Sequence, residues 1–205
     1  KLSKEAFIGI DIGTSGVKIL VVEKTGNIIA NHTEPLGIII KKPGWAEQKP
    51  DDWWEATKKG LIFIVNSLKP KNCEFLSIGL SGQMHSLVGL NSKDKPVYNA
   101  ILWNDGRTHK ECKFIKEKTG SMLGKITGNP PLEGFTAPKM LWLKKHEPKS
   151  YSKITTVMMP KDYIRFMLTG EKFAEPTDAS GTLLYDIHKN KWSKGPGINQ
   201  TRTEK

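Results

Sequence analysis

The segment that most constrains the fold is "FIGIDIGTSGVKILVVE", residues 7–23. Two runs rich in Ile and Val flank the stretch Gly13-Thr14-Ser15-Gly16, which consists of turn-forming residues. The segment therefore predicts a β-hairpin. The turn leads into a strand rather than a helix, and it lacks a Gly-Lys-Ser/Thr ending. It is therefore neither a Walker loop nor a dinucleotide-binding fingerprint.

The residue types at this turn also suggest a chemistry. Clustered backbone N–H groups and two hydroxyls, from Thr14 and Ser15, are groups that bind phosphate. Lys18 adds a positive charge nearby, and Asp11, at the end of the first strand, is suited to hold a hydrated Mg²⁺ ion. The structural alternative is a plain hairpin with a solvated aspartate, and these spacings alone leave both interpretations open.

The rest of the chain predicts an α/β fold with a mixed sheet, because an antiparallel meander comes first and helices follow. Asp51 and Thr136 are predicted to cap helices, and Gly170 to end one. The predicted strands are 28–36, 75–80 (buried), 87–90, 155–159 and 183–187, and the predicted helices are 51–68, 108–119, 139–146 and 161–168. The apolar face of the first helix is predicted to hold Trp54, Thr57, Leu61, Ile64, Val65 and Leu68.

Charge and length narrow the class of protein. The chain has 205 residues and a formal net charge of +11, carried almost entirely by lysines scattered along the sequence. Proteins that read nucleic acid rely on arginine, and here only Arg107, Arg165 and Arg202 are present. We therefore interpret the charge as a solvated surface and expect no nucleic-acid partner. No window approaches the roughly 18 apolar residues of a membrane span, so we expect no membrane partner either.

The cysteines and the chain ends suggest a cytoplasmic domain taken from a longer protein. Cys73 and Cys112 stand far apart without a C-x-x-C motif, and the start has no signal-peptide layout. The start also lacks a Met. We expect residues 1–6 to be a disordered or tag-like start, residues 7–192 to be one domain, and the polar residues 193–205 to be a disordered tail.

Several motifs together carry a resemblance to a known family. "DIGTSGVK" resembles the first phosphate motif of the actin, Hsp70 and sugar-kinase superfamily. The further motifs are "PGWAEQKPDDWW", "GLSGQMHSLVGL", "ILWNDGRT", "LEGFTAPKMLWLKKHEP", "PKDYIRFMLTGE" and "TDASGTLLYDIHKNKWS". In this order and spacing they resemble the FGGY carbohydrate kinases, and within that family the xylulose kinases. The resemblance runs from about residue 7 to residue 192, and its six further motifs make it very specific.

The resemblance implies a ribonuclease H-like domain, of the actin-like ATPase superfamily, that is the first of two domains. It implies transfer of the ATP γ-phosphoryl group, with Mg²⁺, to a hydroxyl of an open-chain sugar such as D-xylulose. In this family the catalytic base is an aspartate of a "GDN"-type segment, which does not occur here. The C-terminal domain that holds most of the ATP is missing as well. We therefore expect this chain alone to be inactive.

Gln83, Met84 and His85 are the first candidates for the sugar site. The resemblance implies that Met84 and His85 line the pocket. The residues themselves agree, because Gly82 breaks an apolar strand and polar side chains follow at the break. A histidine there can hydrogen-bond a sugar hydroxyl through either ring nitrogen. The structural alternative is a core histidine whose ring is satisfied within the protein.

Trp103 and Asp105, in "LWNDGRT", are the next candidates. Trp103 offers a flat apolar wall for sugar carbons, and Asp105 could accept from hydroxyls or pair with Arg107 as part of the structure. Trp53, Trp54 and Trp142 are better read as core. The remaining histidines, His32, His109, His146 and His188, have no metal-ligand spacing.

The exact substrate stays open at the level of the sequence. "MHSL" stands in place of the commoner "MHGL", which leaves gluconate, ribulose or a related polyol as alternatives to xylulose. A non-catalytic sugar-binding module is the alternative from another class. A homodimer of the full-length enzyme is also left open.

Overall fold

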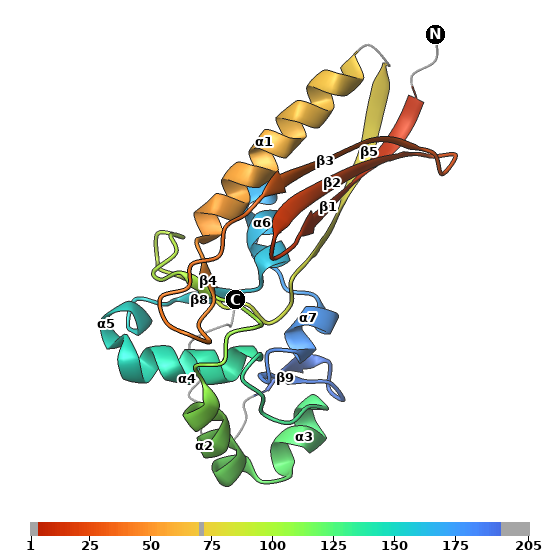
Figure 1. Ribbon diagram of the computed structural model, residues 1–205. Helices are drawn as coiled ribbons and strands as arrows, with labels where there is room; N and C mark the ends of the chain where they lie inside the picture. Colours follow the sequence, from red (N-terminus) through yellow and green to blue (C-terminus); the bar gives the residue numbers. More distant parts are fainter. Residues whose placement is uncertain (1–3, 70–71, 194–205) are drawn as a thin grey trace.

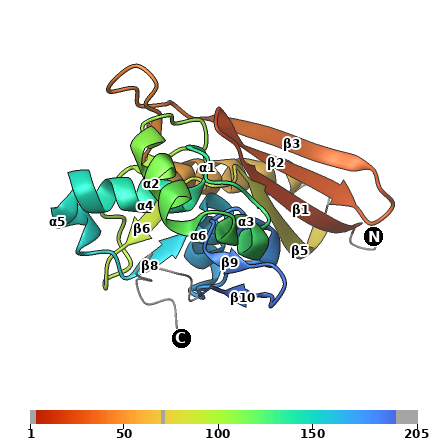
Figure 2. The ribbon, with the colours of Figure 1, turned by 90° about the horizontal axis from the view of Figure 1, so that it is seen from below.

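The computed structural model describes residues 4–69 and 72–193. Its centre is a four-stranded sheet in the order β3-β2-β1-β5. The strands are β1 (Lys4–Ile12), β2 (Gly16–Glu23), β3 (Ile28–Pro35) and β5 (Cys73–Gly82). β1 is antiparallel to β2 and parallel to β5, and Figure 2 shows the four strands side by side. The predicted mixed sheet and the predicted hairpin, with a strand beginning at Gly16, are both confirmed.

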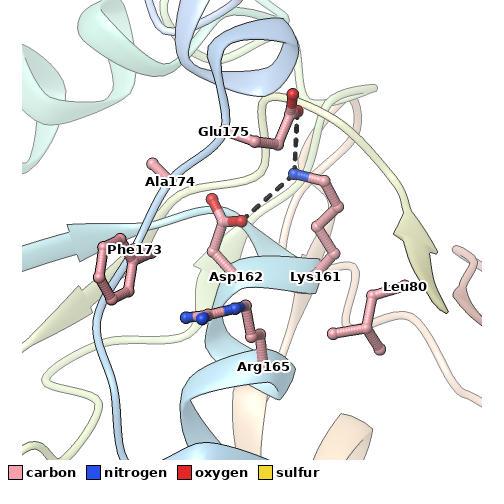
Figure 3. A pocket seen from close by; sticks show the side chains of 7 residues that line it. All are labelled: Leu80, Lys161, Asp162, Arg165, Phe173, Ala174 and Glu175. Atoms are coloured by element: carbon pink, nitrogen blue, oxygen red, sulfur yellow. Dashed lines mark hydrogen bonds and ion pairs between the residues drawn. The ribbon is translucent and has the colours of Figure 1, made fainter. Parts of the chain in front are cut away.

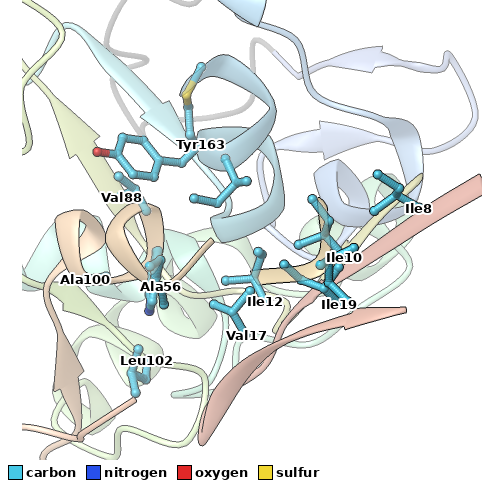
Figure 4. Close-up of a cluster of buried hydrophobic side chains, with 14 of the residues drawn as sticks. Ile8, Ile10, Ile12, Val17, Ile19, Ala56, Val88, Ala100, Leu102 and Tyr163 are labelled. Atoms are coloured by element: carbon cyan, nitrogen blue, oxygen red, sulfur yellow. The ribbon is translucent and has the colours of Figure 1, made fainter. Parts of the chain in front are cut away.

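Among the described residues, one face of this sheet is covered and the other is open. Ile8, Ile10 and Ile12 alternate with exposed residues along β1, and Val17 and Ile19 of β2 lie on the same face. Helices α1 (Pro50–Leu68) and α6 (Pro160–Thr169) pack against it (Figure 1), and Figure 4 shows the resulting apolar cluster. Burial of these side chains stabilises the fold because it removes apolar surface from water.

The buried face of helix α1 overlaps the predicted one, since Thr57, Ile64 and Leu68 are buried as predicted, but it also includes residues that were not predicted for this face. Its buried residues include Trp53, Ala56, Gly60 and Ile64, whereas Val65 is exposed. A Cβ at Gly60 would lie 2.6 Å from Cδ1 of Ile19, so the glycine lets the helix approach β2 closely.

The cap predictions also need correction. α1 begins at Pro50, a residue preset for the first helical turn, so Asp51 lies inside the helix and accepts a hydrogen bond from the Tyr163 hydroxyl at 3.1 Å. Thr136 is likewise a helical residue, and its hydroxyl donates to a neighbouring loop instead of capping. The predicted stop at Gly170 is confirmed, since its φ of +77° is left-handed.

Shorter elements form the second part of the molecule, below the sheet in Figure 1. Its helices are α2 (His109–Thr119), α3 (Met122–Thr127), α4 (Thr136–His146), α5 (Pro148–Tyr151) and α7 (Pro176–Ser180). Its strands are β4 (Glu47–Gln48), β6 (Val88–Leu90), β7 (Ala100–Ile101), β8 (Thr156–Met158), β9 (Tyr185–Asp186) and β10 (Lys191–Trp192). They pair as β4–β7, β6–β8 and β9–β10.

Further expectations differ from the structure. β5 was expected to be buried, but it is an edge strand on which Leu76 and Ile78 are exposed, because no strand pairs with its outer side among the described residues. Residues 4–6, expected to belong to a disordered start, form the beginning of β1. The predicted strand 183–187 is shorter, as β9. Residues 1–3 and 194–205 lie outside the described residues, so the expectations for them are not addressed.

In the described part of the chain, no helix combines the length and the apolar character needed to cross a membrane.

Candidate functional site

The β1–β2 turn is closed by a hydrogen bond from the Gly13 amide to the Gly16 carbonyl, at 3.0 Å. A Cβ at Gly16 would lie 2.7 Å from the Glu34 carbonyl oxygen, so this position has no room for a side chain. The backbone amides of Thr14 and Ser15 have no acceptor among the described residues. The turn therefore presents two amides and two hydroxyls, which fits a phosphate group.

Asp11 and Lys18 face each other across this hairpin. They are cross-strand partners, and both are exposed on the uncovered face of the sheet. Ser81, on β5, is the partner of Asp11 on its other side. The described residues contain no group of three or more His, Cys, Asp or Glu side chains that could hold a metal. A single carboxylate next to a phosphate site matches the usual environment of Mg²⁺, which keeps several waters and binds substrate phosphates.

Gln48 anchors the turn, and it was not among the site residues predicted from the sequence. Its amide nitrogen donates to the Thr14 carbonyl at 2.8 Å and to the Gly37 carbonyl at 3.0 Å. Its side-chain oxygen accepts from the Trp53 indole at 2.9 Å and from the side-chain amide of Gln83 at 3.0 Å. The side chain is buried, and all of its hydrogen-bonding groups are used, so it fixes the turn relative to the loop after β5.

That loop contains the predicted residues Gln83, Met84 and His85. The backbone amide of Gln83 donates to the Ile12 carbonyl at 2.8 Å, so the loop leaves β5 directly beside the turn. The Ser86 hydroxyl donates to the Gln83 side-chain oxygen at 3.0 Å and accepts from the Trp103 backbone amide at 3.1 Å. Gln83 and Ser86 are buried, whereas Met84 is 44% exposed. The structure thus brings the two predicted sugar segments together through Ser86.

Trp103 contacts the turn itself. Its indole nitrogen donates to the Thr14 hydroxyl at 3.0 Å, and its side chain is large, apolar and about half exposed. Large exposed apolar side chains such as Trp103 and Met84 are suited to cover sugar carbons.

His85 is held in one orientation. Its φ of +62° is rare for a residue with a side chain, and its Nδ1 lies 2.9 Å from the Gly181 carbonyl oxygen. A carbonyl can only accept, so Nδ1 carries the proton and Nε2 of the neutral ring is left as an acceptor. Burial lowers the pKa of His85 below its ordinary value, although the bond to Gly181 opposes this shift. The ring also contacts Phe135 edge to face, with centroids 4.6 Å apart.

Asp105 lies deeper than the other predicted residues. It is 1% exposed, and its carboxylate accepts from the Ala46 amide at 2.6 Å and from the Arg107 guanidinium at 2.7 and 2.9 Å. The ion pair with Arg107, which the sequence left open as an alternative, is therefore present.

Arg107 joins Asp105 to a second buried carboxylate. Its guanidinium donates to Glu47 at 2.8 Å and stacks over the Trp45 ring at 3.7 Å. Burial alone would raise the pKa of Glu47, but hydrogen bonds outweigh it and hold the pKa below its ordinary value. Those bonds come from Lys41, Asn99 and Arg107. The cluster supports the loop that carries Trp103.

A separate cavity of about 270 Å³ lies beside α6 (Figure 3) and contains none of the predicted site residues. In it Lys161 forms ion pairs with Asp162 at 3.2 Å and Glu175 at 3.1 Å. Burial raises the pKa of Asp162 to about 6, and its Oδ2 has no donor among the described residues.

The chain belongs to the FGGY family of carbohydrate kinases, whose N-terminal domain matches residues 6–195. It is similar to the xylulose kinase from Lactococcus lactis subsp. lactis (strain IL1403), with 44% identity over 187 residues, which are 91% of this chain and 37% of the relative.

Solved structures show the same fold. A xylulose kinase from Rhodospirillum rubrum has a TM-score of 0.89 at 25% identity, covering 92% of this chain and 39% of that one. A gluconate kinase from Lactobacillus acidophilus has a TM-score of 0.86 at 27% identity, covering 94% and 39%. The predicted ribonuclease H-like, actin-like fold is confirmed. The chain spans under two fifths of the length of the Lactococcus relative.

Proposed function

We propose that a full-length protein carrying this chain transfers the γ-phosphoryl group of ATP to a hydroxyl of an open-chain ketose. D-xylulose, converted to D-xylulose 5-phosphate, is the proposed substrate, because the named relative at 44% identity is a xylulose kinase. This chain supplies the sugar-binding half of that enzyme.

One observation carries the proposal: the turn that is suited to bind phosphate and the two loops that carry the candidate sugar residues are joined by hydrogen bonds into a single unit. Thr14 accepts from Gln48 at its carbonyl and from Trp103 at its hydroxyl, and Gln48 in turn accepts from Gln83. Phosphoryl transfer depends on holding an acceptor hydroxyl in line with a phosphate, so a kinase needs these two kinds of site side by side.

On the sugar side, His85 uses Nε2 to accept a hydrogen bond from a sugar hydroxyl. Met84 and Trp103 cover the apolar edges of the sugar, and Gln83 positions the loop. Asp105 supports this wall from the protein interior and does not contact the sugar directly, because its carboxylate accepts hydrogen bonds from Ala46 and Arg107.

On the phosphate side, the amides and hydroxyls of Thr14 and Ser15 hold the transferred group, and Gly13 leaves room for it. Lys18 would contribute positive charge, and Asp11 would hold a hydrated Mg²⁺ ion. When bound, Mg-ATP supplies the phosphoryl group and the charge that neutralises it.

We further propose that the base and most of the adenosine site lie outside this chain. The experiment is an ADP-release assay on a full-length protein carrying this chain, over D-xylulose, D-ribulose, D-gluconate and glycerol with Mg-ATP. Turnover that is highest with D-xylulose is expected. Highest turnover with D-gluconate would favour the second candidate, suggested by the similar gluconate kinase fold. Absence of turnover with every sugar would overturn the proposal.

The same assay on the 205-residue chain tests the division of labour. We expect no turnover, since loss of a positioned base alone costs about 10²–10⁴ in rate. Turnover within about tenfold of the full-length rate would mean that a carboxylate of this chain, such as the exposed Asp11, acts as the base.

A further inference from the structure

The amine of Lys139 lies inside the protein, on α4. The residue is 0% exposed, and its Nζ donates to two backbone carbonyl oxygens, that of His85 at 2.9 Å and that of Gly134 at 2.6 Å. Among the described residues no carboxylate forms an ion pair with it. A buried lysine without a carboxylate partner is uncommon, because burial of a charge is costly.

The donor count of Lys139 suits a neutral amine. An ammonium has three N–H donors, whereas a neutral amine has two, and two carbonyl acceptors are present. Burial accordingly lowers the pKa of Lys139 to about 7. An apolar side chain would fill the same space without this cost, so the two carbonyls point to a reason for an amine here.

One carbonyl belongs to the candidate sugar residue His85, and the other belongs to Gly134, which packs against the candidate sugar residue Trp103. His85 has left-handed backbone geometry, and its carbonyl receives a second hydrogen bond from the Thr136 hydroxyl at 3.1 Å. Gly134 packs closely against the backbone of Trp103, since a Cβ at Gly134 would lie 2.7 Å from the Trp103 carbonyl oxygen. The Lys139 amine therefore bridges the backbone of His85 to the segment that supports Trp103.

We propose that Lys139 is a positioning residue for the sugar site: its buried amine fixes the His85 loop and the Gly134 segment relative to one another. Without this amine, the carbonyl oxygen of His85 keeps only one of its two hydrogen-bond donors. The unusual backbone conformation of His85 is then less well fixed, and Nε2 no longer points reliably toward the sugar. This inference rests on the proposed function for the identity of the ligand, but not for the contacts themselves.

The kinetic test compares Lys139→Met with Lys144→Met, a change of an exposed lysine on the same helix. In a full-length protein carrying this chain, Lys139→Met is expected to raise KM for D-xylulose about tenfold, as for a lost buried hydrogen bond. KM for ATP is expected to stay unchanged. Lys144→Met should alter neither value.

A second readout needs no enzymatic activity. In NMR spectra of this chain, the ring signals of His85 are expected to shift in Lys139→Met and to stay in place in Lys144→Met. If the full-length protein phosphorylates none of the sugars, the proposed function fails, while these signals still decide whether Lys139 positions His85. Unchanged His85 signals together with an unchanged KM, in a folded variant, would overturn the inference.

If Lys139→Met does not fold, Lys139→Gln takes its place, because it keeps two N–H donors on a shorter side chain. The same two readouts then apply, with smaller changes expected in the same direction. A folded Lys139→Gln with wild-type KM and unshifted His85 signals would overturn the inference as well.

Discussion

The indole nitrogen of Trp103 donates a hydrogen bond of 3.0 Å to the hydroxyl of Thr14, although 89 positions separate the two residues in the chain. Thr14 lies in the turn that fits phosphate, and Trp103 forms the exposed apolar wall next to it. The bond fixes the distance between the two halves of the candidate site. An error in that distance would misalign a sugar hydroxyl with a phosphate.

The first prediction concerns this bond. In a full-length protein carrying this chain, Trp103→Phe and Thr14→Val each remove it, and each is expected to lower kcat/KM for D-xylulose roughly fivefold or more, in line with about 1 kcal/mol for a hydrogen bond. The double variant should lose less than the product of the two single effects, because both remove the same bond. Steady-state kinetics on the four proteins measures this coupling, and fully multiplicative losses would show that the bond does not act in the site.

The second prediction concerns Gly181, against which the His85 ring packs. A Cβ at this position would lie 2.3 Å from Cε1 of His85, so Gly181→Ala must displace the ring. We expect KM for D-xylulose to rise with little change in KM for ATP. Gly124→Ala is the control, because a Cβ there meets nothing within 4 Å. Wild-type KM in a folded Gly181→Ala protein would mean that the position of His85 does not matter for sugar binding.

The hairpin and the mixed sheet were predictable because their signals are local. Alternating apolar residues and a glycine-rich turn define β1, β2 and their connection without reference to the rest of the chain. The position of β5 at the edge of the sheet, with exposed side chains, was not predictable in this way. A run such as "FLSIGL" looks the same at the centre of a sheet and at its edge, and only the tertiary structure shows which strands lie beside it. The packed face of α1 was predicted only in part, because Ala56 and Gly60 are small, although Gly60 marks a close approach to β2.

The candidate site was predictable only in its short segments. Residues 11–18 form one continuous segment and residues 83–85 form another, so a local motif could indicate each of them. Gln48 and Lys139 act through contacts with distant segments, which no local pattern encodes. The one available signal for Lys139 was its place in the apolar run "APKMLWL", where a charged side chain is unexpected.

The third prediction is a pH dependence of stability caused by Lys139. Its pKa is about 7 in the folded chain and has the ordinary value of 10.5 when unfolded. Between these values the unfolded chain binds more protons, so raising the pH stabilises the folded state, by at most about 1.4 kcal/mol per pH unit. Urea unfolding of wild type and Lys139→Met should therefore give a difference in unfolding free energy that grows in favour of the wild type as the pH rises from 7 to about 8.5.

The neighbours of Lys139 are common to both proteins. Asp105, Arg107 and His85 face it, as does Cys112, whose pKa burial raises to about 11. The thiol acts in the opposite direction above pH 9, since the folded state then holds the extra proton, so the measurement stays below that range. Lys144→Met should follow the wild type throughout. A difference that stays flat between pH 7 and 8.5 would mean that Lys139 remains charged when buried.

The most direct test of the central claim is the effect of His85→Ala on the kinetics of a full-length protein carrying this chain. Loss of the acceptor at Nε2 is expected to cost on the order of 1–3 kcal/mol in sugar binding, and so to raise KM for D-xylulose roughly tenfold or more, with KM for ATP unchanged. His109→Ala, at a side chain that is 82% exposed, is the matched control and should behave as wild type. An unchanged KM for D-xylulose in a folded His85→Ala protein would contradict the account and assign His85 to the core.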